Sequence, residues 1–384
     1  MRIILVTGTG GAGRTAVATA TALAEARAGR RVVLVSGDTG DTGDTGADVA
    51  DTGPGTLRLL TPTPAADFRR EFLALQARST TALDLLGTTP FEDAELTELP
   101  GSAQFALLRA VRDAAVTDAD LVVVDLPPLR EALALLALPE QLRRYLRRLL
   151  PPERQAARAL RPMLAQLAGV PLPAQWLYET TARWEAELAA VQEVVDSPDT
   201  GVRLVVEPGP AASDALRTAR LGLALQGLAL DAVVANRVLP ADSADPWFAA
   251  LAAEQHRHLA ALREEHPAVR ELPHLGRAPR GPEDLLLLAV EDTPAAPVPG
   301  WRVEDRREAD GILVWHVPLP GAVKDGLSLV RRGDELLLAA GPFRRNVPLP
   351  AVLRRCTVTG AGLVEGDLRI RFTPDPGLWP KAAP

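Results

Sequence analysis

The residues best suited to chemistry lie near the N-terminus, in a segment that reads GTGGAGRT from Gly8 to Thr15. It follows an apolar run directly and precedes a helical pattern. Glycines let successive backbone N–H groups turn toward a phosphate without Cβ clashes, and a following helix adds its favourable dipole. The spacing matches G-x-x-x-x-G-[K]-[ST], with Arg14 in the lysine position. We therefore expect a phosphate-binding loop whose Thr15 hydroxyl is available to Mg²⁺.

The same glycines leave a second interpretation open. Gly8, Gly10 and Gly13 also satisfy G-x-G-x-x-G. Asp38 ends the second apolar run, about where a nicotinamide-binding fold has its ribose-binding acid. A hydroxyl at Thr15, the VVVDLPP strand end and the lack of a Tyr-x-x-x-Lys pair favour a triphosphate instead. The loop alone does not exclude an NAD(P)-binding oxidoreductase.

The elements that would position this loop appear in the hydrophobic pattern of residues 1–292. Short apolar runs alternate with helical patterns, which predicts an α/β fold with a mostly parallel sheet flanked by helices. Residues 139–196 contain helical patterns and no strand, so we expect a helical insertion there. The expected strands are Arg2–Thr7, Arg31–Ser36, Thr56–Leu60, Leu121–Asp125, Val202–Glu207, Asp231–Asn236 and Val269–Leu272. The expected helices are Arg14–Ala28, Ala66–Leu86, Ala103–Ala115, Glu131–Leu149, Arg154–Leu167, Ala174–Val195, Ser213–Gln226 and Pro246–Glu265.

The expected insertion carries an apolar stripe. Such a stripe most often belongs to a core, but it is also the surface that a groove for a hydrophobic client would need. The sequence leaves both interpretations open. The members of the stripe are Leu146, Leu149, Leu150, Leu160, Met163, Leu164, Leu167, Trp176, Leu177, Trp184 and Leu188.

The chain changes character after residues 293–300, TPAAPVPG, which are typical of a linker. Residues 301–374 contain short strand patterns between turn residues, and they predict a small all-β sandwich. Residues 375–384 form a tail. Near the N-terminus, the repeat GDTGDTGDTG at residues 37–46 is typical of a loop.

Composition narrows the class of protein. The net charge of −7 argues against a nucleic-acid partner, because phosphate-binding surfaces are usually basic. The single cysteine, Cys356, allows neither an internal disulfide nor a cluster of cysteine ligands. No apolar stretch reaches the roughly 18 residues that span a bilayer, and no leader pattern precedes the first strand. The sequence thus predicts a cytoplasmic protein without a transmembrane segment.

Taken together, the motifs resemble the ArsA-like family of arsenical-pump and tail-anchored-protein-targeting P-loop ATPases, in its actinobacterial form. The family's loop K-G-G-x-G-K-T corresponds to residues 9–15, and its switch I to SGDTGD at residues 36–41. Its switch II corresponds to DLPPLREALALLALP at residues 125–139, and its base-reading strand end to ANRVLP at residues 235–240. Residues 301–374 resemble the α-crystallin (small heat-shock-protein) domain that some of these proteins carry. The resemblance covers nearly the whole chain.

The resemblance implies a site for ATP and Mg²⁺. Asp38 would orient the attacking water, Asp125 would support Mg²⁺ through water, and Asn236 would hydrogen-bond adenine. The implied catalytic residues are Asp38, Arg14 and Asp125, and the implied metal-associated residues are Thr15 and Asp125. No zinc is expected, because the family's C-x-x-C pair is absent. The implied nucleotide-binding residues are Gly8, Gly10, Gly11, Ala12, Gly13, Arg14, Thr15, Asn236 and Arg237.

Several substitutions depart from the family pattern. Thr9 replaces the lysine that reaches the partner subunit's phosphates, and Arg14 replaces the second lysine of the loop. In switch II, Arg130 and Glu131 replace a glycine and a histidine. Phosphoryl transfer depends on positioned charge, so these changes predict weakened hydrolysis.

Two functional hypotheses follow from the resemblance and its departures. One is an ATP-binding protein, a Mg-ATPase with a degenerate loop, that couples its nucleotide state to a hydrophobic or membrane-bound client. The other is an inactive scaffold or holdase. The expected assembly is a homodimer, or a heterodimer with a lysine-bearing paralogue.

Overall fold

The computed structural model divides into two compact units. The residues described are 1–37, 53–78, 89–149, 175–266, 268–292, 298 and 300–379. The first unit comprises Met1–Val6, Thr15–Thr200 and Pro279–Glu291; the second comprises Thr7–Arg14, Gly201–Ala278 and Asp292–Pro384.

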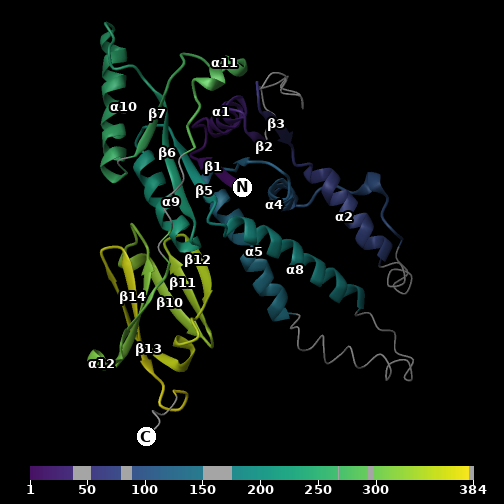
Figure 1. The fold of residues 1–384 in the computed structure, drawn as a ribbon, viewed down its shortest axis with the longest axis vertical. Coiled ribbons are helices and arrows are strands. Elements are labelled where there is room, and N and C mark those ends of the chain that lie inside the picture. The colour runs from purple at the N-terminus through teal and green to yellow at the C-terminus, as the bar shows by residue number, and fades with distance from the viewer. Residues whose placement is uncertain are drawn as a thin grey trace. The chain divides into compact units, whose positions relative to one another are not determined.

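The N-terminal elements form a seven-stranded sheet in the order β3-β2-β4-β1-β5-β6-β7, flanked by helices (Figure 1). The strand pairs β1–β4, β2–β3, β2–β4, β5–β6 and β6–β7 are all parallel, which confirms the predicted α/β fold. Every residue of β4 and β5 is buried, as expected of apolar strands covered on both faces. The strands are β1 (Arg2–Gly8), β2 (Arg31–Val35), β3 (Thr56–Leu60), β4 (Leu121–Asp125), β5 (Thr200–Val206), β6 (Ala229–Val238) and β7 (Val269–Pro273).

Most of the helices lie within a few residues of their predicted positions. They are α1 (Arg14–Arg27), α2 (Pro64–Arg78), α4 (Ser102–Ala115), α5 (Leu129–Leu149), α8 (Gln175–Val195), α9 (Ala212–Gln226), α10 (Pro246–Glu265) and α11 (Gly281–Leu286). The short α11 was not predicted, because six residues carry too little periodicity. The predicted helix 154–167 and the end of the predicted helix 66–86 beyond residue 78 lie outside the described residues. So does the repeat at residues 37–46 from residue 38 onward.

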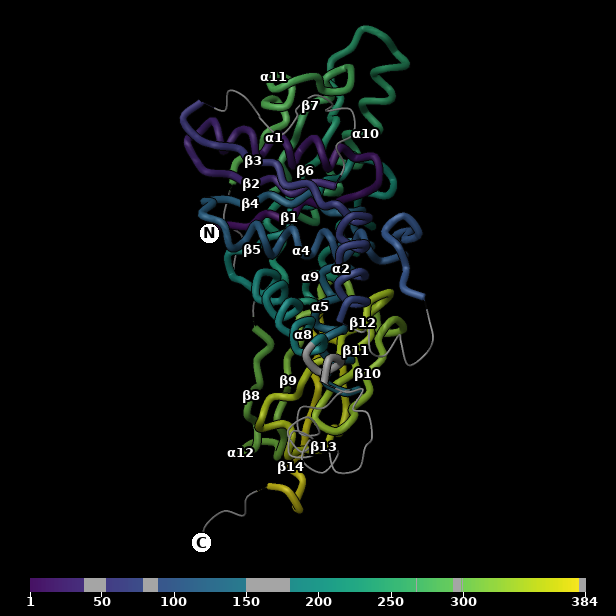
Figure 2. The backbone as a smooth tube through the Cα atoms, turned by 90° about the vertical axis from the view of Figure 1, so that its right-hand side faces the viewer, coloured from purple at the N-terminus to yellow at the C-terminus, as the bar shows by residue number. Residues whose placement is uncertain are grey.

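The C-terminal strands form two antiparallel sheets, β10-β11-β12 and β13-β14-β9-β8, which confirms the predicted all-β architecture (Figure 2). Two strands were not predicted: β8, whose four residues VEDR are mostly charged, and β13, which contains two glycines. The strands are β8 (Val303–Arg306), β9 (Ile312–Pro318), β10 (Leu327–Arg332), β11 (Glu335–Ala340), β12 (Phe343–Pro348), β13 (Cys356–Val364) and β14 (Asp367–Pro374).

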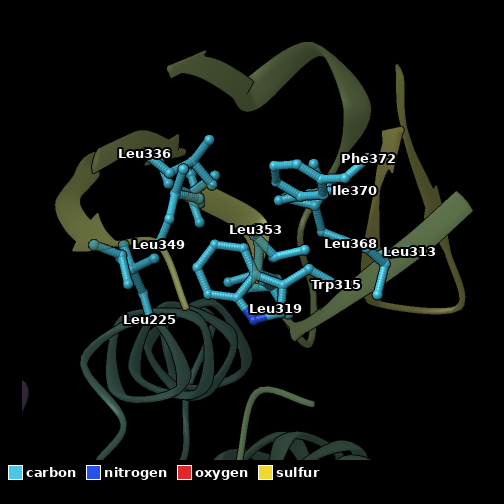
Figure 3. Close-up of a cluster of buried hydrophobic side chains, with 14 of the residues drawn as sticks. Leu225, Leu313, Trp315, Leu319, Leu336, Leu349, Leu353, Leu368, Ile370 and Phe372 are labelled. Atoms are coloured by element: carbon cyan, nitrogen blue, oxygen red, sulfur yellow. The ribbon is translucent and has the colours of Figure 1, made fainter. Parts of the chain in front are cut away.

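The two sheets enclose one hydrophobic core, to which α9 also contributes (Figure 3). Trp315 of β9 and Phe372 of β14 are almost fully buried there, beside Leu225 of α9. The Arg345 guanidinium donates a hydrogen bond of 2.8 Å to the Leu225 carbonyl. The sandwich therefore packs on a helix of the sheet region, and the boundaries at residues 292 and 301 remain predictions.

A buried histidine joins three strands of the larger sheet. His316 of β9 is 7% exposed, and its ring nitrogens lie 2.8 Å from Asp367 Oδ2 and 2.9 Å from Glu304 Oε2. The hydrogen bond with His316 holds the pKa of Glu304 below its ordinary value. Burial acts to raise the pKa of Asp367, but hydrogen bonds from His316 and Arg369 outweigh burial and leave that pKa lowered.

A His316→Leu substitution is expected to lower the melting temperature by roughly 4 °C, because it removes a shared partner from two carboxylates. A carboxyl group whose pKa is lowered in the folded state stabilises the fold at a pH above its unfolded-state pKa, which is about 4. This stabilisation is lost as the pH falls through the pKa of the folded state. The variant should therefore lose less stability than the wild type on acidification below about pH 4. Thermal unfolding between neutral and acidic pH measures both effects. His274→Leu, at an exposed histidine, is the control; equal melting temperatures and equal pH slopes in all three proteins would contradict the prediction.

Candidate functional site

The glycine-rich segment forms a tight connection between β1 and α1, held against β5. A Cβ added at Gly8 would lie 1.8 Å from the Val205 carbonyl oxygen, so no larger residue fits. The backbone N–H of the next residue, Thr9, donates to that same oxygen at 3.1 Å. Gly8 therefore lets the loop leave the sheet in contact with the neighbouring strand.

The middle of the segment has the backbone geometry that a phosphate loop needs. Gly11 and Gly13 have φ values of +79° and +84°, which lie in the region that favours glycine. A Cβ added at Gly10 or Gly11 would meet no atom within 4 Å. The residues present thus fit a bound phosphate group, with α1 beginning at Arg14 directly behind the loop.

The end of β6 supports this loop through Asn236, which is 3% exposed. Its Nδ2 donates to the Ala12 carbonyl at 2.8 Å, and its Oδ1 accepts from the Arg237 N–H at 2.9 Å. A Cβ at Gly13 would lie only 2.5 Å from Asn236 Nδ2. Asn236 therefore braces the phosphate loop, and the adenine contact expected for it remains a prediction. The Arg237 guanidinium, also expected at the nucleotide, forms an ion pair of 3.1 Å with Glu207.

In the first unit, the structure brings together the two residues expected at the metal. The Thr15 hydroxyl, in the first turn of α1, donates to Asp125 Oδ2 at 2.7 Å. Asp125 ends β4 and is 8% exposed. The Ser36 hydroxyl, at the end of β2, donates to the same oxygen at 3.2 Å. Ser36 belongs to the segment that resembles switch I, but no role was predicted for it. Its place directly after the buried strand β2 was the available signal.

Arg14, Arg130 and Glu131 each lie in the first turn of a helix. Asp38 falls outside the described residues. Arg14 is half-buried at the start of α1. Arg130 and Glu131 occupy the first turn of α5 and are both exposed. The catalytic roles expected for Asp38 and Arg14 therefore remain predictions.

Protein ligands for a metal ion are sparse near the loop. In the part of the chain that the structure describes, no group of three or more His, Cys, Asp or Glu side chains is arranged to hold one. Mg²⁺ commonly takes only one or two protein ligands and completes its shell with water and substrate phosphates. The pair formed by Thr15 and Asp125 fits that kind of site, in which the nucleotide would supply much of the coordination.

A separate apolar groove of about 600 Å³ lies among α2, α4, α5 and α8 of the first unit. The apolar side chains of α2 form one wall of this groove, and no residue of this helix is buried. The stripe members Leu146, Leu149, Trp184 and Leu188 line it, and the rest of the predicted stripe lies outside the described side chains. The apolar lining comprises Phe68, Phe72, Leu75, Leu99, Phe105, Leu142, Tyr145, Leu146, Leu149, Trp184, Leu188 and Val191.

Four of the charged side chains that line the groove pair with one another. Arg109 of α4 forms ion pairs with Glu71 of α2 at 3.5 Å and with Glu187 of α8 at 3.3 Å. Arg112 lies 3.8 Å from the same Glu187. These pairs tie three helices together and neutralise part of the charge of the lining. Most of the other lining side chains are apolar, so the groove offers mainly apolar surface to a ligand.

The parallel sheet, the glycine loop opening α1 and the strand-end aspartate define a P-loop-like nucleotide-binding protein. The sequence profile of the anion-transporting ATPases matches residues 1–289, and that of the HSP20-like domain found in ArsA matches residues 310–372. The chain belongs to the ArsA family of ATPases. Its N-terminal region carries the ATPase pattern, and its C-terminal sandwich carries the HSP20-like one.

Similar proteins match this chain over nearly its whole length. An uncharacterized protein of Streptomyces coelicolor is 56% identical, over 99% of this chain and 100% of its own. A protein of Mycobacterium tuberculosis is 32% identical, over 99% of this chain and 97% of its own length. A protein of Aquifex aeolicus named as a putative arsenical pump-driving ATPase is 26% identical, over 96% of this chain and 99% of its own length. No helix among the described residues combines the length and hydropathy needed to cross a membrane.

Proposed function

We propose that the chain is a cytoplasmic Mg-ATP-binding protein that couples its nucleotide state to the handling of a hydrophobic client. The nucleotide half of this proposal rests on the 2.7 Å hydrogen bond between Thr15 and Asp125. In the chain, Thr15 comes directly after the glycine loop, whose backbone fits phosphate. Family membership supports the choice of ATP over a nicotinamide cofactor.

The residues of the site have distinct tasks in this proposal. The backbone N–H groups of the loop bind the phosphates, and Asp125 orients the Thr15 hydroxyl. Bound Mg·ATP supplies the triphosphate and the cation that neutralises its charge. Arg14 keeps a positive charge but lacks the compact ammonium of lysine, and Thr9 supplies none. We therefore expect ATP binding with slow hydrolysis.

An inactive scaffold or holdase is the second candidate. Arg130 and Glu131, which replace the family's switch II glycine and histidine, favour it. A heterodimer would reconcile both candidates, because a lysine-bearing paralogue would supply in trans the charge missing at Thr9.

The groove is the proposed client site. Its aromatic and leucine lining, in which four charged side chains pair with one another, suits an apolar helical segment of another protein better than an anion. Arsenite is a poor candidate, because the family's arsenite cysteines are absent and burial raises the pKa of the single thiol, Cys356.

The first arm of the test is isothermal titration with a non-hydrolysable Mg·ATP analogue, with NAD as the control. Micromolar binding of the analogue alone is expected. Binding of NAD alone would identify a nicotinamide enzyme, and binding of neither would favour the inactive scaffold.

The second arm measures binding of a fluorescent 20-residue apolar helical peptide with and without the analogue. Trp184→Glu places a charge in the groove and is expected to weaken binding at least about tenfold, since a buried unpaired charge costs more than 1.4 kcal/mol. Trp247→Glu is the matched control, because Trp247 is 74% exposed on α10 outside the groove lining. Equal peptide affinity in both variants would show that the groove is not the client site. Peptide affinity that does not change with the analogue would show that client binding is not coupled to the nucleotide.

A further inference from the structure

A buried glutamine in α10 contacts the irregular end of β6 (the 236–239 turn), where the register with β7 shifts between Ala235 and Val238. Gln255 is 8% exposed. Its Nε2 donates to the Arg237 carbonyl at 2.9 Å, and its Oε1 accepts from the Leu239 N–H at 2.8 Å. Both functional atoms of one amide are therefore engaged by two backbone groups, one in the last turn-forming residues of β6 and one directly after the strand.

This turn needs external support. Arg237 has a φ of +59°, a left-handed conformation that non-glycine residues rarely adopt. Its N–H is bound by the Asn236 side chain, while its carbonyl is bound by Gln255. Such a conformation persists only where the surroundings determine it. These two side chains are part of those surroundings, together with the His274 N–H, which donates to the Val238 carbonyl at 2.9 Å.

The same turn determines where Asn236 lies, and Asn236 contacts the phosphate loop. Its Nδ2 donates to the Ala12 carbonyl at 2.8 Å. The contacts thus run without a break from Gln255 through Arg237 and Asn236 to Ala12, all within the second unit.

We infer that Gln255 is a positioning residue for the phosphate loop, acting through the 236–239 turn. Its effect on nucleotide affinity rests on the proposed function, whereas its effect on the loop itself does not. Without the amide, the Arg237 carbonyl and the Leu239 N–H lose a partner, and the left-handed turn relaxes. His256 still reaches the Leu239 carbonyl at 3.1 Å, so α10 stays attached to the turn while the brace on Ala12 loosens.

The test compares Gln255→Met, which keeps the length of the side chain but neither hydrogen bond, with Gln255→Glu, which keeps only the acceptor for Leu239. The matched control is Leu259→Ala, a core truncation on the same helix at a residue 2% exposed. Hydrogen exchange is followed in the loop, where the Thr9 and Ala12 amides are bound to the carbonyls of Val205 and Thr9. Titration with the Mg·ATP analogue is run on the same four proteins, the wild type included.

In Gln255→Met, the loop amides should exchange about tenfold faster and the analogue should bind about tenfold more weakly, the scale of one lost buried hydrogen bond. Gln255→Glu should lie between Gln255→Met and the wild type. Leu259→Ala should lower the melting temperature and leave both readouts unchanged.

The two readouts separate this inference from the proposed function. Faster loop exchange in Gln255→Met without analogue binding by the wild type supports the inference and rejects the nucleotide site. Unchanged loop exchange in Gln255→Met, or the same acceleration in Leu259→Ala, overturns the inference whether or not the analogue binds.

Discussion

A Thr9→Lys/Arg14→Lys double variant is expected to hydrolyse ATP on the order of 100-fold faster than the parent chain, because positioned cations stabilise the charge of the transferring phosphoryl group. The rest of the loop is already suited to this change. Its glycines have the required backbone conformations, and Thr15 is bound to Asp125. Single-turnover hydrolysis of radiolabelled ATP, at several protein concentrations, measures the effect and any dependence on a second subunit.

The matched control adds Thr15→Val to the double variant. It keeps both new lysines but removes the hydroxyl that contacts Asp125, and it should be as slow as the parent. A double variant as inert as the parent would show that the loop is not the defect. The substitutions at Arg130 and Glu131 in switch II would then account for the lost hydrolysis.

An Asp231→Ala substitution is expected to lower the free energy of unfolding by about 3–5 kcal/mol, the cost of removing one partner from a buried ion pair. The Asp231 carboxylate lies 3.3 Å from the Arg203 guanidinium, between β6 and β5, and both side chains are 0% exposed. Removing the carboxylate leaves a buried positive charge without this counter-ion. Urea unfolding, followed by circular dichroism, measures the change.

Two further variants test the explanation. Arg203→Met with Asp231→Leu removes both charges and should recover most of the stability, since apolar replacements of a buried pair are often close to neutral. Asp214→Ala removes a partner from the exposed pair with Arg217 and should cost about 1 kcal/mol or less. An Asp231→Ala cost no larger than that of Asp214→Ala would contradict the prediction.

The sheet region could be predicted closely from sequence, because its strands are short, apolar and covered on both faces. The predicted Leu121–Asp125 is the observed β4, and Thr56–Leu60 is the observed β3. The glycine loop could be predicted equally well, because the spacing of its glycines indicates where the backbone must adopt conformations that favour glycine. The strand β8 was not, because its exposed, charged residues resemble a loop.

By itself, the sequence determined the α/β fold, the position of the phosphate loop, the residues Thr15 and Asp125 and the β-rich C-terminal region. These features depend on local periodicity or on residue type at one point of the chain. Only the tertiary structure decided that Asn236 braces Ala12, that α9 completes the core of the sandwich and that part of the apolar stripe lines a groove. Asn236 and Ala12 are 224 residues apart, and a contact between such distant residues leaves no periodic pattern in the chain. The same holds for the groove, whose walls come from four helices that the folded chain brings together.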